Sequence, residues 1–250
     1  MNLSTRGFWN GRIVLFVAAL MLTSLVVSAS PITGTFGFDG PGVLAFSNTG
    51  DFIDFCSSVT GTTCNNDGSG TGSFTVTGAG TQSFSVLTGS TKGSIDDMSD
   101  VHATGYTYFP VGVPVSIDDI ISLAGFCTWD FQANMLPLAS CTASSTQQCL
   151  GPFQLDAQGP NVAVEMNIYG TLINTADGSK SYTDLAITGN YLDTTIAAVE
   201  AGAESKAGIF SNNWSASLIA AVPEPGTGPL MLLAGGGLVA FSRIRRQRKL

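Results

Sequence analysis

The strongest constraint on the fold of this 250-residue chain is an alternation of apolar and polar residues from Ser30 to about Ile219. The alternating segments are short, rich in Thr, Val, Ile and Phe, and separated by Gly, Asn, Asp and Ser. This pattern is typical of half-buried antiparallel strands. The apolar faces predicted in this way are Phe74 with Val76, Phe84 with Val86, Val162 with Val164, Met166 and Ile168, and Trp214 with Ala216 and Leu218. We therefore predict an all-β domain, an antiparallel β-sandwich of jelly-roll-like type with one short helix, and leave its strand order open.

Two segments add local detail to this fold. The sequence "ADGSK", residues 176–180, predicts a hairpin turn in which Asp177 and Gly178 adopt positive φ. The alanine-rich segment Thr194–Gly208 predicts the short helix, inserted before the last strand. The residues at helical spacing in that segment are Ile196, Val199 and Ala203.

Charged residues are sorted along the chain, which the formal net charge of −8 conceals. Between Ser30 and Val222 there are seventeen acidic residues, only three lysines and no arginine. So acidic a segment repels phosphate backbones, which argues against nucleic acid as a partner. The arginines lie instead near the two ends of the chain.

The amino-terminal segment has the layout of a secretory signal peptide. Arg6 and Arg12 precede an apolar run, Ile13–Val27, and small residues then occupy the positions before a cleavage site after Ala29. We predict a signal peptide over residues 1–29 and an exported domain over residues 30–221. An amino-terminal membrane anchor is the alternative, and in either case the domain leaves the cytoplasm.

The cysteines suit an oxidising compartment. Cys56 and Cys64 flank one short polar loop, and Cys141 and Cys149 flank another, so each pair can form a disulfide with little strain. This pairing leaves Cys127 free.

A second pairing is also compatible with the sequence. If Asn134 sits at the centre of a hairpin, Cys127 lies opposite Cys141, and Cys149 is left free. A zinc site is disfavoured, because the chain has no CxxC motif and its only histidine is His102.

The carboxy-terminal segment, residues 222–250, combines three unlike elements. Pro223, Glu224 and Pro225 form a stiff, extended tripeptide. Gly228–Ser242 is uncharged and predicts a transmembrane helix, although fifteen residues span only about 22 Å of a hydrocarbon core of about 30 Å. Arg243–Lys249 then carries five positive charges, which favour the cytoplasmic side of a membrane.

These three elements, in this order, closely resemble the PEP-CTERM sorting signal. The residues that carry the resemblance are Pro223, Glu224 and Pro225 together with Arg243, Arg245 and Arg246. The resemblance implies a substrate of exosortase, a membrane enzyme of exopolysaccharide-producing Gram-negative bacteria that cuts near the tripeptide. A plain carboxy-terminal membrane anchor is the alternative interpretation.

The exported domain is also similar to other proteins that carry this signal. The matching segments are "GSFTV", "CTASSTQQCLGPFQL" and "WSASLIAAVPEP". That resemblance supports pairing of Cys141 with Cys149, and it implies no known activity.

Candidate catalytic residues in the domain are few. A triad would need His102, which has no GxSxG motif or recognisable cysteine partner motif nearby. Paired carboxylates for polysaccharide hydrolysis are the stronger alternative, with surface charge as the simpler interpretation. The candidates are Asp51 with Asp54, Asp96 with Asp97 and Asp100, Asp118 with Asp119, and the glutamates Glu165, Glu200 and Glu204.

Binding sites are the remaining possibility. Oxygen-rich segments at residues 65–72 and 94–100 leave calcium open, although neither has EF-hand spacing, and we predict no cofactor. Tyr106, Tyr108 and Trp129 form either a sugar-stacking platform or part of the core.

Taken together, these features predict a non-enzymatic protein that is anchored in the inner membrane as a precursor and then processed by exosortase. Its destination would be the cell surface or an extracellular matrix rich in exopolysaccharide, as in a biofilm. A carbohydrate-binding module and a carboxylate-pair hydrolase are the alternative functions.

Overall fold

The computed structural model describes residues 32–46, 52–57, 59–60, 63–64, 71–125, 128–142, 144–204, 209–210 and 213–221. For residues 43–46, 59–60, 63–64 and 209–210 the backbone alone is described. The predicted signal peptide (1–29) and the carboxy-terminal segment (222–250) lie outside the described residues, as do Asp51 and Cys127.

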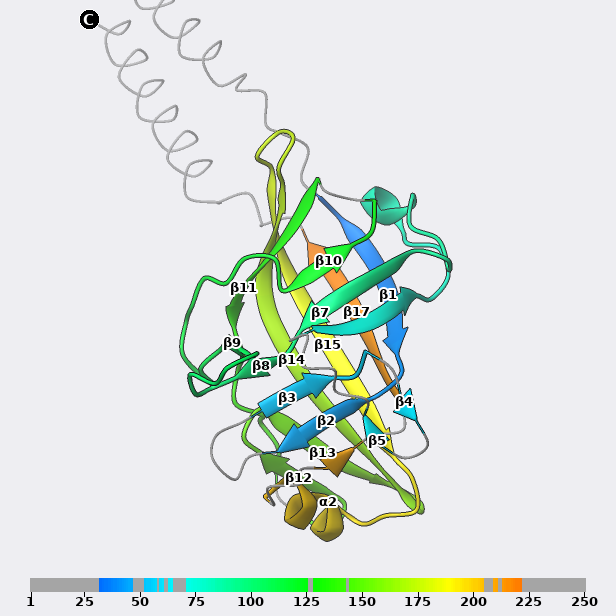
Figure 1. Cartoon of the computed structure of the whole chain (residues 1–250), viewed down its shortest axis with the longest axis vertical. Helices are drawn as coiled ribbons and strands as arrows, with labels where there is room; N and C mark the ends of the chain where they lie inside the picture. The colour runs from blue at the N-terminus through cyan, green and yellow to red at the C-terminus, as the bar shows by residue number, and fades with distance from the viewer. Residues whose placement is uncertain are drawn as a thin grey trace, which may run out of the picture. The chain divides into compact units, whose positions relative to one another are not determined.

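Ten strands form one large, curled sheet whose strand pairs are all antiparallel (Figure 1). Its order is β10 (Ile121–Leu123), β7 (Lys92–Asp96), β6 (Thr71–Val76), β1 (Gly34–Gly40), β17 (Asn213–Ala221), β15 (Lys180–Tyr191), β14 (Asn161–Asn174), β13 (Phe153–Gln158) and β12 (Gln147–Leu150). The tenth strand, β11 (Trp129–Met135), also pairs with β14, beyond the part of β14 that β13 occupies. The longest strand, β14, therefore has two successive partners along one edge.

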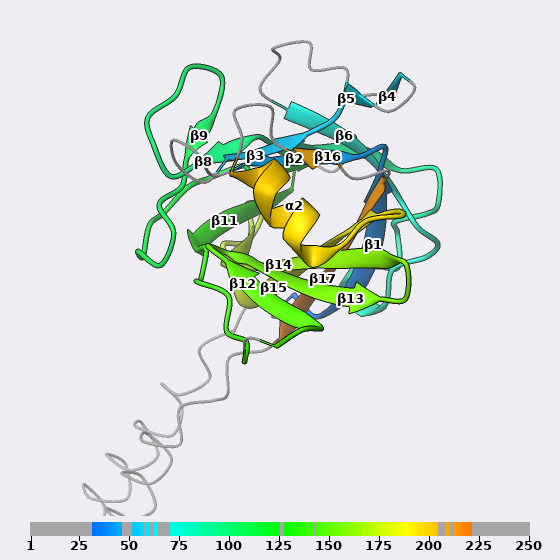
Figure 2. The same ribbon diagram turned by 90° about the horizontal axis from the view of Figure 1, so that it is seen from below.

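A smaller sheet lies opposite part of the large one (Figure 2). Its order is β16 (Ile209–Phe210), β2 (Val43–Phe46), β3 (Phe52–Phe55), β8 (Met98–Ser99) and β9 (Thr107–Tyr108), with β8 and β9 parallel. A separate two-stranded ribbon joins β4 (Val59–Thr60) to β5 (Thr63–Cys64). The prediction of a mostly antiparallel β domain is confirmed. The sheets of ten and five strands, however, differ from the eight strands and two Greek keys of a jelly roll.

The core lies between the two sheets and follows the predicted alternation. Along β14, Val162, Val164, Met166 and Ile168 are all buried, as predicted. The same holds for Trp214, Ala216 and Leu218 of β17 and for Phe74 and Val76 of β6.

Aromatic side chains from both sheets meet at Trp214. The ring of Trp214 lies 5.0 Å from that of Phe55 and 5.7 Å from that of Phe38 between centroids. Phe38 in turn packs 4.2 Å from Phe74. A Cβ at Gly40 would collide with the Trp214 ring, so only glycine allows this close approach of β1. Burying each large apolar side chain contributes about 1.5–3 kcal/mol, so this cluster fixes the smaller sheet against the larger one.

The predicted strand over Phe84 and Val86 is wrong. Residues Gln82–Phe84 form the 3₁₀ turn η1, and only Phe84 is buried, whereas Val86 is exposed. The chain follows β1 as far as Ser83, whose N–H donates to the Thr33 carbonyl at 3.0 Å. Local hydrogen bonds then reverse the direction of the chain, so that the Phe84 ring lies in the core, 5.0 Å from the ring of Phe36.

The predicted hairpin joins β14 to β15, with one correction to its turn. Gly178 adopts φ +72°, but Asp177 does not have positive φ. Instead, the Asp177 carboxylate accepts the N–H of Ser179 at 2.9 Å. This hydrogen bond lowers the pKa of Asp177.

The predicted helix is present as α2, Ile196–Ala203, shorter than the alanine-rich segment. Ile196, Val199 and Ala203 are its buried residues, as predicted. Thr195 caps its amino end, where the hydroxyl accepts the N–H of Ala198 at 3.3 Å. The helix lies at one end of the domain, against β12, β13, β2 and β16 (Figure 2). Among the described residues, no helix has the length and apolar character needed to cross a membrane.

Candidate functional site

Two of the predicted acidic residues meet in the interior, although the sequence grouped them with other partners. Asp54 on β3 and Asp97 after β7 are 1% and 3% exposed. The Asp97 carboxylate accepts the N–H of Phe55 at 2.7 Å, and the Tyr106 hydroxyl donates to Asp54 at 3.2 Å. Burial raises the pKa of Tyr106 well above its usual range, and the two carboxylates beside it raise it further. This network ties β3 to the segment that carries Tyr106.

Three other acidic candidates, Asp96, Asp118 and Asp119, form hydrogen bonds with other residues. Asp96 accepts a hydrogen bond from the Thr107 hydroxyl at 3.0 Å, and burial raises its pKa. Asp118 and Asp119 instead lie near Asp130 on β11, whose carboxylate accepts the Asp119 N–H at 3.2 Å. Burial raises the pKa of Asp130, and the nearby negative charges raise it further.

The chemistry open to the Asp54–Asp97 network is limited by its enclosure. Both carboxylates are surrounded by protein, and one oxygen of Asp97 is occupied by a backbone N–H. A glycosidase needs two carboxyl groups that flank a bound sugar. The arrangement instead suits a structural network that holds the β8–β9 region against β3.

The three aromatic residues considered either as a sugar-stacking platform or as part of the core each pack against a different ring. Tyr106 packs edge-on against Phe52 at 5.2 Å, and Tyr108 stacks on the exposed His102 at 3.8 Å. Trp129 packs edge-on against Phe84 at 5.1 Å and is half-buried. The three aromatic rings therefore contact three different partners, and His102 serves as a stacking partner for Tyr108.

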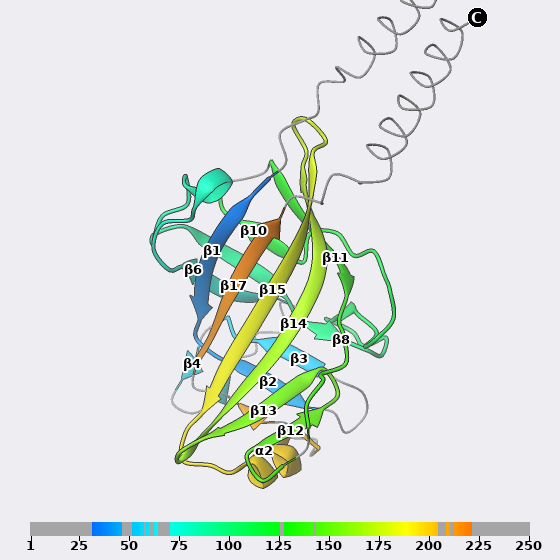
Figure 3. The ribbon, with the colours of Figure 1, turned by 180° about the vertical axis from the view of Figure 1, so that it is seen from behind.

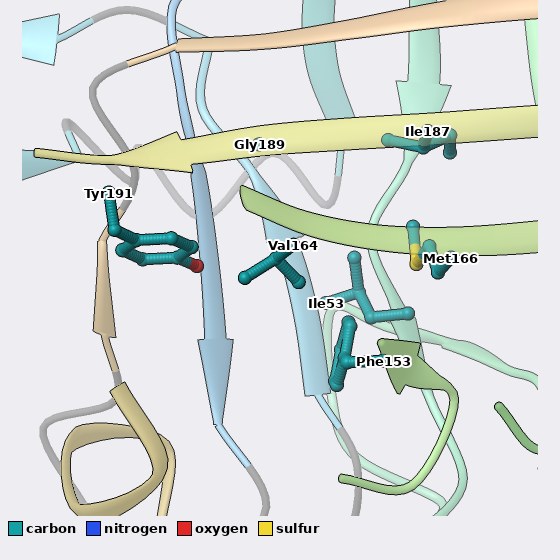
Figure 4. Close-up of a pocket in the computed structure, with 7 residues that line it drawn as sticks. All are labelled: Ile53, Phe153, Val164, Met166, Ile187, Gly189 and Tyr191. Atoms are coloured by element: carbon teal, nitrogen blue, oxygen red, sulfur yellow. The ribbon is translucent and has the colours of Figure 1, made fainter. Parts of the chain in front are cut away.

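A small apolar cavity lies in the core between β3 and the inner faces of β14 and β15 (Figure 4). Its volume is about 20 Å³, enough for a water-sized molecule only. Burial raises the pKa of Tyr191, which lies at one end of it. The residues that line the cavity are Ile53, Phe153, Val164, Met166, Ile187, Gly189 and Tyr191.

An open groove of about 170 Å³ lies on the outer face of the large sheet, and the sequence did not predict it. It arises where β14 lacks a neighbour on one edge. β13 pairs with β14 as far as Glu165, and β11 begins its pairing at Tyr169. Residues 137–140, between β11 and β12, line this gap. The groove is lined by Pro137, Leu138, Ala139, Ser140, Pro152, Gln154, Glu165, Met166, Asn167 and Tyr169.

The groove combines an aromatic ring with hydrogen-bonding groups. Glu165, Asn167 and Tyr169 alternate along the outer face of β14, so their side chains point to the same side. Tyr169 is exposed, whereas Glu165 and Asn167 are half-buried. Among the described residues, none forms a side-chain hydrogen bond with Glu165 or Asn167. These groups are therefore available to a ligand.

A disulfide closes the segment beside the groove. Cys141 is bonded to Cys149, with 6.1 Å between their Cα atoms, which confirms the predicted pair. The alternative Cys127–Cys141 pairing is wrong, because Asn134 lies inside β11 and not at a hairpin turn. Cys56 is also disulfide-bonded, while the side chain of Cys64, its predicted partner, lies outside the described residues.

No metal centre is assembled in the part of the chain that the structure describes. Within it, no three His, Cys, Asp or Glu side chains are grouped so as to hold a metal ion. Of the two segments considered for calcium, residues 94–100 are described, and residues 65–70 lie outside the described part.

Residues 221–247 match the PEP-CTERM protein-sorting motif. The chain carries this sorting signal. The signal implies an exported, membrane-anchored precursor that exosortase processes. No curated protein and no solved structure matches the chain.

Proposed function

We propose that this chain is an exosortase-processed protein of the cell surface or of an extracellular, exopolysaccharide-rich matrix, and that it has no catalytic activity. The observation that carries the proposal is the PEP-CTERM motif, which begins at Ala221, the last residue of β17. The sorting signal thus follows a folded β domain with no intervening linker. The enclosed, hydrogen-bonded state of Asp54 and Asp97 supports the non-catalytic part of the proposal.

Mass spectrometry of the native protein tests the sorting step. In its host the finished protein should end near Pro223–Pro225 and lack the basic segment Arg243–Lys249. In a host without exosortase, or with all three residues of the tripeptide changed to alanine, the full chain to Leu250 should accumulate. Thr227→Ala, just beyond the tripeptide, is the matched control and should be processed normally. An intact carboxy terminus on the finished wild-type protein would refute the proposal.

A second candidate function, carbohydrate binding, is favoured by the groove on β14. The Tyr169 ring offers an apolar face, and the neighbouring Glu165 and Asn167 offer hydrogen-bonding groups that can meet sugar hydroxyls. Two prolines in the lining and the Cys141–Cys149 disulfide limit the movement of its wall. Because the domain is strongly acidic, a neutral glycan suits the groove better than an anionic one.

A glycan array probed with the exported domain tests this second function. Tyr169→Ala and Asn167→Ala should each abolish or strongly weaken binding to a neutral glycan. Tyr108→Ala is the control, because Tyr108 has a similar exposure but stacks on His102 away from the groove residues. Binding that survives both groove substitutions would place the ligand elsewhere. If the wild-type domain binds no glycan, the carbohydrate-binding function is refuted and only the matrix role remains.

A further inference from the structure

The last strand before the sorting signal is hydrogen-bonded on both edges almost to its end. β17 lies between β1 and β15 (Figure 3), with Gly34 opposite Ala220 and Tyr182 opposite Ala221. A protease that binds its substrate as an added strand cannot pair with the chain while both edges are occupied. Main-chain recognition of this substrate can therefore begin only at the end of β17, at Ala221 and beyond.

The distance from the sheet to the tripeptide is short. Pro223 is two residues beyond Ala221, and two extended residues span at most about 7 Å. Six residues separate Ala221 from Gly228, where the predicted membrane helix begins, and they can span up to about 20 Å. The domain therefore need not touch the bilayer. An enzyme that encloses the tripeptide must touch the domain, because Pro223 lies within about 7 Å of the end of β17.

An apolar patch lies on the outer face of the sheet at this point. Tyr182 is 65% exposed, Ile219 47% and Tyr169 42%. Asp184 pairs directly with Ile219 on one side and with Tyr169 on the other, and Tyr182 is diagonal to both. We call these four residues the exit patch, because β17 leaves the sheet beside them. Because Tyr182 is the third residue of β15, the patch lies at the end of the sheet where the hairpin joins β14 to β15 (Figure 3).

We propose that the exit patch is a docking surface for exosortase, which meets the folded domain there when it binds the tripeptide. This inference rests on the proposed processing of the sorting signal. Tyrosine is enriched in the energetically dominant positions of protein interfaces, and exposed Ile219 extends the apolar surface. The single carboxylate at the centre of the patch selects a partner with a cationic group at the matching position.

Processing of the full-length precursor in its host tests the proposal. The variant Tyr182→Ser with Ile219→Thr should slow conversion of precursor to product by about tenfold, as expected for loss of interface anchors. The control is Tyr108→Ser with Leu192→Thr: Tyr108 is 40% exposed and Leu192 51%, and Leu192 follows the opposite end of β15. The control should be processed at the wild-type rate. Thermal unfolding of each mature domain verifies that the substitutions leave the fold intact.

Inserting a linker before the tripeptide distinguishes docking of exosortase on the exit patch from steric obstruction of the tripeptide by the domain. Ten Gly-Ser residues inserted between Ala221 and Val222 should remove the imposed contact, so that the patch variant and the wild-type patch are then processed at equal rates. Processing of the uninserted patch variant at the wild-type rate would overturn the inference. Failure of the tripeptide variant to block processing would instead overturn the proposed function.

A bilayer partner is the remaining outcome of the test. Mature domains with and without the patch substitutions would be mixed with vesicles of phosphatidylethanolamine and phosphatidylglycerol and separated by flotation. Neither domain should float with the vesicles. Flotation that depends on Tyr182 and Ile219 would assign the patch to the lipid surface and overturn exosortase docking.

Discussion

Replacing Asp97 with alanine should destabilise the domain by about 2–3 kcal/mol. The carboxylate accepts the Phe55 N–H at 2.7 Å in a site from which water is excluded. A hydrogen bond to a charged group contributes about 1.5–3 kcal/mol, and a buried N–H left without an acceptor costs about 1–3 kcal/mol. The two values are not added, because both describe the loss of the same hydrogen bond. Asp97→Asn retains an acceptor oxygen, so it should cost less than half as much.

Urea unfolding followed by tryptophan fluorescence measures this loss. Trp214 is a suitable reporter, because its ring lies 5.0 Å from that of Phe55, whose N–H is the donor to Asp97. The disulfides are kept oxidised in all variants, and the slope of the free energy against urea should stay constant if the denatured state is unchanged. For a domain of this size each kcal/mol corresponds to about 2–4 °C in Tm.

The ranking of the two variants decides between a structural and a catalytic Asp97. A structural acceptor predicts that alanine is much worse than asparagine for stability. Equal stability of Asp97→Ala and the wild-type protein would refute the reasoning. Loss of a polysaccharide-cleaving activity in Asp97→Asn or Asp54→Asn, with stability retained, would establish the hydrolase alternative.

Three further predictions concern other parts of the domain. Thr195→Ala removes the hydroxyl that caps α2 and should cost about 1 kcal/mol in the same urea experiment, with Thr194→Ala, a half-buried neighbour that does not cap the helix, as a comparison. Replacing both Cys141 and Cys149 with serine should cost about 2–3 kcal/mol, measured as free energy of unfolding, and should weaken any glycan binding in the adjacent groove. Burial raises the pKa of Asp184 in the folded protein above its ordinary value of 3.8, so the folded protein binds this proton more readily than the unfolded chain does. The domain therefore loses stability as the pH rises from the unfolded-state pKa through the folded-state pKa of Asp184. Asp184→Asn should therefore stabilise the domain at pH 7 but not at pH 3, and an equal effect at both pH values would contradict the assignment.

The sequence predicted those parts of the fold in which side-chain burial follows from a local period. The buried faces of β14 and β17 and the three buried residues of α2 are of this kind. Phe84 is a residue whose burial does not follow from a local period. A single apolar residue that turns into the core looks the same in sequence as one on a strand, because periodicity does not record the hydrogen bonds that Ser83 and Thr81 donate to Thr33 and Thr35.

The acidic residues show a second limit, because their grouping in sequence was a poor guide to their grouping in space. Asp96 and Asp97 are adjacent in the chain, yet their side chains accept hydrogen bonds from different segments. Asp97 and Asp54 are forty-three residues apart and share one buried network through Tyr106. Alternation along an extended segment directs neighbouring side chains to opposite faces, so adjacent carboxylates are poor candidates for a catalytic pair.

The groove on β14 could not be predicted from sequence, because it depends on which strands pair with β14. The sorting signal does not depend on strand pairing. Met166 and Ile168 stay buried throughout the gap between β13 and β11, because the inner face is still covered by the core. Apolar alternation therefore continues across a stretch where one strand edge is unoccupied. The pattern reports which face is buried, whereas the groove depends on which neighbour is missing. A sorting signal is a linear motif and needs no such neighbour, so its role was predictable from the sequence, while any glycan site required the strand pairing.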